Sequence, residues 1–154
     1  MKTYHKLTIE EKKKWGYPDE HQLDDIQKDK LNQFISWARD NKVKFIESEK
    51  HLYSQDLWIG GIVDLVFEMN GKRYIGDIKT SKNVYPEMFA QMGAYDIMLQ
   101  EMGHKPFDGY IILHIPQKGS LKVVQTKHME LNRNYFKAAL ELYKIKKMVD
   151  GSIN

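Results

Sequence analysis

The sequence contains no cysteine among its 154 residues. Disulfide bonds, thiolate zinc sites and iron–sulfur clusters are therefore excluded, so a bound metal must use carboxylate, imidazole or backbone oxygen ligands. The sequence also lacks any apolar run near the roughly 20 residues that a membrane-spanning helix needs, and residues 1–14 lack the apolar stretch of a signal peptide. We therefore expect a cytoplasmic protein without a membrane partner, which would use hard cations if it binds metal.

Linkers, repeats and low-complexity segments are absent as well. The four prolines and ten glycines are spread along the chain, and 42% hydrophobic with 29% charged residues is ordinary globular usage. A chain of this length usually forms one core. We therefore expect residues 1–154 to form a single domain.

The positive charge of the chain is concentrated near its C-terminus. The net charge is only +3, and residues 1–80 carry 14 basic and 14 acidic side chains. Residues 118–147, in contrast, carry eight lysines or arginines against two glutamates. This segment is either a solvated helix face without a partner or a surface that contacts phosphates.

Hydrophobic periodicity and capping residues predict the secondary structure. Thr8 and Glu11 form a capping-box pattern, Pro86 suits the first turn of a helix, and Gly103 and Gly151 suit helix ends. The expected fold class is α/β (α+β), with a central mixed β-sheet flanked by helices, because each element must bury its apolar face against another layer. The predicted elements are helices at residues 8–16, 24–41, 86–102 and 132–150 and strands at residues 43–52, 59–69, 72–79, 109–115 and 121–126.

Asn70-Gly71 predicts a tight hairpin between two of these strands, because a type I′ turn needs positive φ at both central residues. If these two residues form the loop, paired positions sum to 141, so that Asp64 lies opposite Asp77. Lys79 then falls on the same face, opposite Ile62. The other face is expected to be core and carries Val63, Leu65, Phe67, Tyr74 and Ile78.

Two opposed carboxylates repel each other and destabilise a sheet unless positive charge lies between them. Mg²⁺ or Mn²⁺ would supply that charge, since such cations are typically held by one or two carboxylates plus water and phosphate oxygens. Lys79 would add positive charge beside the metal. The alternative is a partly solvated hairpin end in which Lys79 alone neutralises Asp64 and Asp77.

Three short segments follow one another in this part of the chain: Gly61-Ile62-Val63-Asp64, Asp77-Ile78-Lys79-Thr80-Ser81 and Gln91-Met92-Gly93-Ala94-Tyr95. A glutamate, Glu49, precedes the first of them. The segments resemble the G-x-x-D, (D/E)-x-K and Q-x-x-x-Y motifs of RecB-like PD-(D/E)XK nucleases, including phage-type exonucleases, in which a glutamate precedes the first motif at a similar interval. The resemblance covers about residues 30–115.

The resemblance implies a restriction-endonuclease-like core and a role for each matching residue. Asp64 and Asp77 would be metal ligands, with the Ile78 carbonyl as a third donor. Lys79 would position or polarise the attacking water, and Glu49 would be an accessory ligand at the edge of the site.

Gln91 and Tyr95 are separated by four residues, so they lie on one face of the predicted helix. The resemblance implies that both contact the substrate strand or brace Lys79. The alternative for Tyr95 is packing within the helix interface.

One feature departs from the superfamily pattern. Many RecB-like nucleases carry a metal-binding histidine on an N-terminal helix, whereas here only His5 and His21 precede Glu49, and neither matches that helix. Either one of them substitutes, or the site is weaker or holds a single ion.

The resemblance implies a metal-dependent DNA exonuclease of phage or bacterial recombination and repair. The residues also fit this chemistry, since phosphodiester hydrolysis needs an activated water and neutralised phosphate charge. The basic C-terminal segment would then contact phosphates, and Trp58 or Tyr85 would stack on a base or lie at the rim. Alternatives are an inactive nucleic-acid-binding module and a metal-stabilised hairpin in a protein with another task. The motifs are compatible with exonuclease or endonuclease action and with a single- or double-stranded substrate. They are also compatible with a homo-oligomer.

Overall fold

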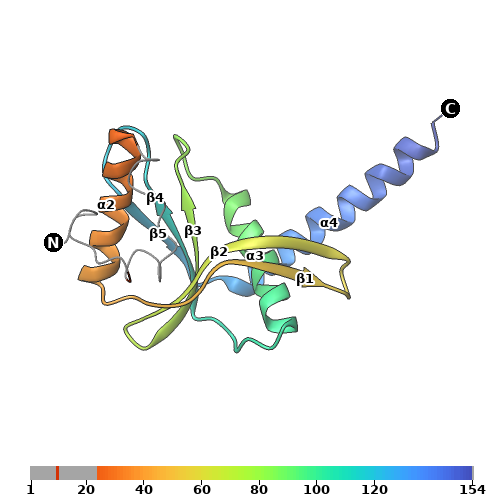
Figure 1. Cartoon of the computed structure of the whole chain (residues 1–154). Coiled ribbons are helices and arrows are strands. Elements are labelled where there is room, and N and C mark those ends of the chain that lie inside the picture. The colour runs from red at the N-terminus through yellow and green to blue at the C-terminus, as the bar shows by residue number, and fades with distance from the viewer. Residues whose placement is uncertain (1–9, 11–23, 154) are drawn as a thin grey trace.

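The computed structural model describes residue 10 and residues 24–153 (Figure 1). The bounds of the described helices and strands agree with the predicted bounds to within three residues. The short helix expected at residues 8–16 lies outside the described residues except for Glu10. The described elements are α2 (Asp25–Asp40), β1 (Lys44–Ser54), β2 (Ile59–Met69), β3 (Lys72–Lys79), α3 (Pro86–Glu101), β4 (Gly109–His114), β5 (Lys122–Thr126) and α4 (Met129–Gly151).

The five strands form one mixed sheet in the order β1-β2-β3-β4-β5. Neighbouring strands are antiparallel except for β3 and β4, which are parallel and are joined through α3. The predicted mixed sheet flanked by helices is therefore confirmed. A parallel pair needs a long crossover, and here the crossover helix covers one face of the sheet.

Helices cover both faces of the sheet, α2 on one side and α3 on the other (Figure 1). One apolar cluster joins Phe34 and Ile35 of α2 to Phe67 of β2, and the second joins Met92 and Leu99 of α3 to the opposite face. Strand β4 is buried along its whole length because both of its faces are covered.

The Asn70-Gly71 turn is confirmed, with φ of 54° and 73° at its two central residues. The predicted register is also confirmed from Met69–Lys72 to Leu65–Gly76. The paired ladder ends there, however, and does not continue to Asp64 with Asp77 or to Ile62 with Lys79.

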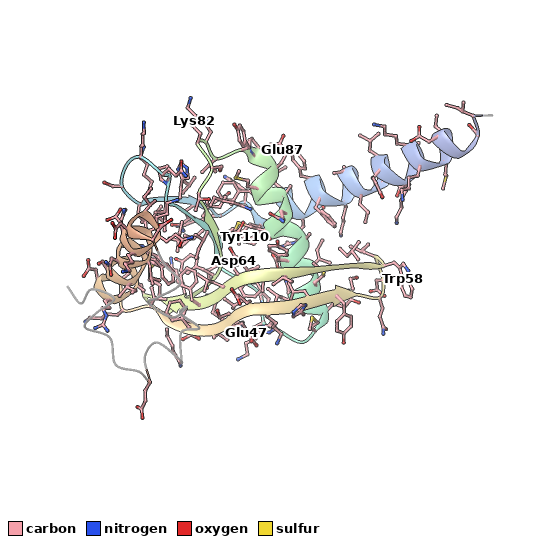
Figure 2. All side chains as sticks on the ribbon, turned by 45° about the horizontal axis from the view of Figure 1, so that its top comes forward. Glu47, Trp58, Asp64, Lys82, Glu87 and Tyr110 are labelled. Carbon is pink, nitrogen blue, oxygen red and sulfur yellow. The ribbon has the colours of Figure 1, made fainter. Side chains whose placement is uncertain are left out.

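Beyond this point β2 leaves β3 and stays paired with β1 as a long hairpin, whose tip Trp58 marks (Figure 2). The expectation that Val63 shares a face with Leu65 is therefore wrong. Val63 packs in the α3 cluster and Leu65 in the α2 cluster, because the strand alternation breaks at Asp64. The backbone N–H of Gln55 donates to Glu101 Oε1 of α3 at 2.9 Å, which ties the hairpin tip to the end of that helix.

Helix α4 crosses α3 and then projects away from the body of the molecule (Figure 1). It begins three residues earlier than predicted and has no fully buried residue. Its N-terminal half approaches α3 closely at Gly93, where a Cβ atom would lie only 2.6 Å from the Asn132 carbonyl oxygen. No helix within the described residues is long and apolar enough to cross a membrane.

Candidate metal and phosphodiester site

Asp64 and Asp77 come together where β2 separates from β3. The Ile78 N–H donates to Asp64 Oδ2 at 2.9 Å, so the carboxylate replaces the backbone acceptor that the departing strand no longer supplies. Asp77 lies close enough to Asp64 to raise the pKa of that carboxyl through hydrogen bonding and through its negative charge. The two carboxyl groups therefore meet as the sequence predicted, although their residues are not a ladder pair.

The Asp64 carboxyl holds its proton unusually tightly. The pKa of Asp64 is raised from 3.8 to about 7, mainly by burial and then by the hydrogen bond and negative charge of Asp77. The Ile78 N–H and Lys79 oppose this shift. The positive charge of Lys79 therefore only partly offsets the tendency of two carboxylates in a partly buried site to take up a proton.

Lys79 lies beside this pair. Its Nζ is 2.9 Å from Asp77 Oδ2 and donates to Gln91 Oε1 of α3 at 3.3 Å. Since Lys79 and Asp77 both point to the α3 face of β3, Gln91 holds the ammonium group against the carboxylate pair. The predicted bracing of Lys79 by Gln91 is therefore present in the structure.

Asp77 is only 4% exposed, and its Oδ2 makes no hydrogen bond within the described residues. The ion pair with Lys79 is its close polar contact, without hydrogen-bond geometry. The ammonium of Lys79 compensates part of the lost solvation of this oxygen, but without a hydrogen bond its lone pairs stay available to a cation. This oxygen, next to a second carboxylate, is the kind of donor that a hard cation binds, so Asp64 and Asp77 fit a divalent metal.

Tyr95 faces the same carboxylates from α3. Burial raises the pKa of its hydroxyl to about 12, and the charges of Asp77 and Asp64 act in the same direction. Its hydroxyl is hydrogen-bonded to Gln91, and its ring packs with the α3 core cluster. Tyr95 therefore packs in the helix interface, which was the alternative considered from the sequence, and its contact with a substrate strand stays a prediction.

The other described residues that were expected to donate to a metal do not place a side chain beside Asp64 and Asp77. Ile78 packs its side chain toward α2, which leaves its peptide group beside Asp64. Glu49 falls opposite Asp64 in the β1–β2 register, but its side chain is exposed and its φ is 48°. Within the described residues no third acidic or histidine side chain joins the pair in a metal-binding group. His5 and His21 lie outside the described residues.

A groove of about 590 Å³ runs beside the site, between the start of β2, α3 and α4. Gln91 and Tyr95 line it, whereas Asp64, Asp77 and Lys79 do not, so the groove adjoins the site only through these two α3 side chains. Gly61 forms part of its wall and contacts the Tyr95 ring closely, since a Cβ atom there would lie 3.2 Å from Tyr95 Cε1. Trp58 and Tyr85 are exposed at 86% and 50%, which places them at the rim rather than in the core.

Sequence reasoning missed a buried network that fixes the helices around this groove. Asp96 of α3 is fully buried and accepts hydrogen bonds from Tyr110 Oη and, at 2.8 Å, from Arg133 Nη1 of α4. The signal in the sequence is an aspartate directly after Tyr95 on the apolar side of a helix. Such a residue needs buried partners, but their identity depends on the tertiary fold.

His114 is a second residue that sequence reasoning missed. It is 7% exposed, pairs with Lys79 in the β3–β4 register, and its Nε2 lies 2.6 Å from the Ser81 carbonyl oxygen. This contact fixes the chain immediately after Lys79.

No protein-family model matches this chain, and no curated protein matches it either. The function of this chain is therefore inferred from the site itself.

Proposed function

We propose that this protein is a divalent-metal-dependent hydrolase of phosphodiester bonds in DNA, acting as an exonuclease of the PD-(D/E)XK type. The observation that carries the proposal is the buried Asp77 oxygen without a hydrogen bond, beside Asp64 and 2.9 Å from Lys79. Asp64, Asp77 and the Ile78 carbonyl oxygen are the groups that would hold Mg²⁺ or Mn²⁺. The bound cation would neutralise charge developing on the phosphate and lower the pKa of water.

The chain's own residues have complementary roles in this proposal. Lys79 carries a positive charge beside the carboxylates, where it orients the attacking water or a phosphate oxygen. Gln91 holds the Lys79 ammonium in place. Tyr95 stays protonated because its pKa is about 12, so its hydroxyl can donate to the substrate without adding negative charge.

The groove and the basic C-terminal segment support a nucleic-acid substrate. The groove leads away from Gln91 and Tyr95 and is open to solvent along α4. Lys137, Lys144 and Lys147 on the exposed surface of α4 add positive charge suited to phosphates. A carboxylate pair suited to a metal that neutralises phosphate charge and a basic helix surface on the same chain support the same substrate class.

A second candidate is a nucleic-acid-binding module without catalytic activity. The observation that favours it is that only two carboxylates converge within the described residues. A weak or absent metal site would leave Lys79 paired with Asp77 and ready to bind a phosphate.

One assay separates the two candidates. End-labelled linear DNA and closed circular DNA, each single- and double-stranded, are incubated with Mg²⁺, Mn²⁺ or EDTA. We expect metal-dependent hydrolysis of linear DNA only, with none in EDTA. Cleavage of circles would establish an endonuclease, and salt-dependent binding without hydrolysis under either metal would establish the binding module instead.

A further inference from the structure

The outer surface of α4 exposes a regular series of apolar side chains. Leu131, Leu142 and Val149 are 67%, 66% and 53% exposed, and Tyr135 and Ile145 are 43% and 48% exposed. A chain that folds alone rarely leaves so many large apolar residues of one helix in water.

These residues follow the spacing of a coiled coil. Successive members are separated by four, three, four, three and four residues, which is the a/d pattern of about three heptads. A globular amphipathic helix has a wider apolar stripe at a period of 3.6 residues. Two further exposed apolar residues of α4, Tyr143 and Met148, lie outside the a and d positions. The series is Leu131, Tyr135, Ala138, Leu142, Ile145 and Val149.

The seam faces away from the body of the molecule beyond Tyr135, whose hydroxyl donates to Glu87 Oε1 of α3 at 3.4 Å. Helix α4 packs on α3 through Asn132, Arg133 and Phe136, as shown by the close approach to Gly93, the ion pair with Asp96 and the apolar core cluster. With 3.6 residues per turn, these positions lie roughly 150° around the helix from the seam. A partner helix can therefore lie along the seam from Ala138 to Val149 without meeting α3.

Charges beside the seam specify the partner. With Tyr135, Leu142 and Val149 at a positions, Glu141 occupies a g position and Lys146 the e position five residues later. In a parallel two-stranded coiled coil, a g residue meets the e residue five positions further along the other helix. Glu141 thus meets the partner's Lys146, and the same pair forms twice by symmetry.

We propose that α4 is a dimerisation helix through which two copies of this chain pair as a parallel coiled coil. An antiparallel pair would place g positions opposite g positions, so Glu141 would face asparagine, glutamate or methionine and never Lys146. The two bodies lie on opposite sides of the seam, and each carries its own Asp64–Asp77 pair. The inference is independent of the proposed hydrolysis.

Charge reversal gives a direct test, because Glu141 and Lys146 are both exposed and their substitution leaves the packing on α3 unchanged. Molar mass is measured by sedimentation equilibrium at low salt for the wild type, for Glu141→Lys and for Lys146→Glu. We expect the wild type to approach twice 18.2 kDa as concentration rises, with dissociation in the micromolar range because three heptads are short. Each single variant should dissociate about tenfold more readily, since it places like charges at both sites.

Mixing the two single variants provides the decisive control. The Glu141→Lys chain has lysine at both positions and the Lys146→Glu chain has glutamate at both, so the mixed pair regains both opposite-charge contacts. We expect the mixture to dimerise more strongly than either variant alone, and Leu142→Lys to abolish dimers. A monomeric wild type, or charge variants that behave like the wild type, would overturn the proposal.

Discussion

Replacing Asp77 by asparagine should lower metal-dependent DNA hydrolysis by about a thousandfold or more, because it removes one of the two anionic ligands and its share of charge neutralisation. The substitution preserves the shape of the side chain. The measurement is the initial rate of release of labelled nucleotides from linear DNA in Mg²⁺ and in Mn²⁺.

The same variant should be at least as stable as the wild type in EDTA. Asp77 is buried beside a second carboxyl and has an oxygen without a hydrogen bond, whereas an asparagine amide can donate to Asp64. An Asp77→Asn protein that is inactive but more stable than the wild type is expected if the carboxylate pair serves function at a cost in stability. Thermal melting of both proteins in EDTA measures this effect.

Glu68→Gln is the matched control for Asp77→Asn. Glu68 is a β2 carboxylate paired with Arg73 at the far end of the same hairpin, outside the site. Its substitution should leave hydrolysis within about twofold of the wild type, since surface changes have small effects. Equal activity of the Asp77→Asn protein and the wild type would remove the pair from the mechanism.

Replacing Gly93 by alanine should produce the largest loss of folding stability. The added Cβ atom would lie 2.6 to 2.8 Å from three backbone atoms of Asn132 and Arg133. Backbone atoms cannot rotate away as a side chain does, so α4 must shift and strain its Arg133–Asp96 ion pair. We expect a loss of about 2–4 kcal/mol in the free energy of unfolding, measured by urea denaturation.

Gly151→Ala is the matched control for Gly93→Ala. Gly151 also lies in a helix, but a Cβ atom there would meet nothing within 4 Å. Alanine should leave stability unchanged or raise it by less than about 1 kcal/mol, through helix propensity alone. A loss at Gly93 no larger than the change at Gly151 would contradict the close helix crossing.

The sequence predicted the parts of the site that depend on local pairing. Asn70 and Gly71 set the turn, the turn set the register, and the register brought Asp64 close to Asp77. Helical spacing then placed Gln91 and Tyr95 on one face. Each step depends on a few neighbouring residues, whose geometry varies little between proteins.

The remaining features depend on contacts between distant segments. The alternation of side chains along β2 breaks at Asp64 because the β1–β2 hairpin turns over α3. Regular strand alternation therefore could not predict on which face Val63 and Glu49 lie. Gly93 was part of a motif, but its structural role as the crossing point of α4 required knowledge of which helix lies against it. A buried Asp96 likewise requires a hydrogen-bond partner, but only the tertiary fold identifies Tyr110 and Arg133 as its partners.

The most direct test of the proposed metal site is a Mn²⁺ binding isotherm, measured by the electron paramagnetic resonance signal of free Mn²⁺ at about pH 8 and about pH 5.5. We expect the wild type to bind Mn²⁺ at the higher pH and to bind it about tenfold more weakly for each unit below pH 7. The reason is that the cation must displace the proton of Asp64, whose pKa is about 7. Asp77→Asn should bind at neither pH, whereas equal binding by that variant and the wild type would contradict a metal site at Asp64 and Asp77.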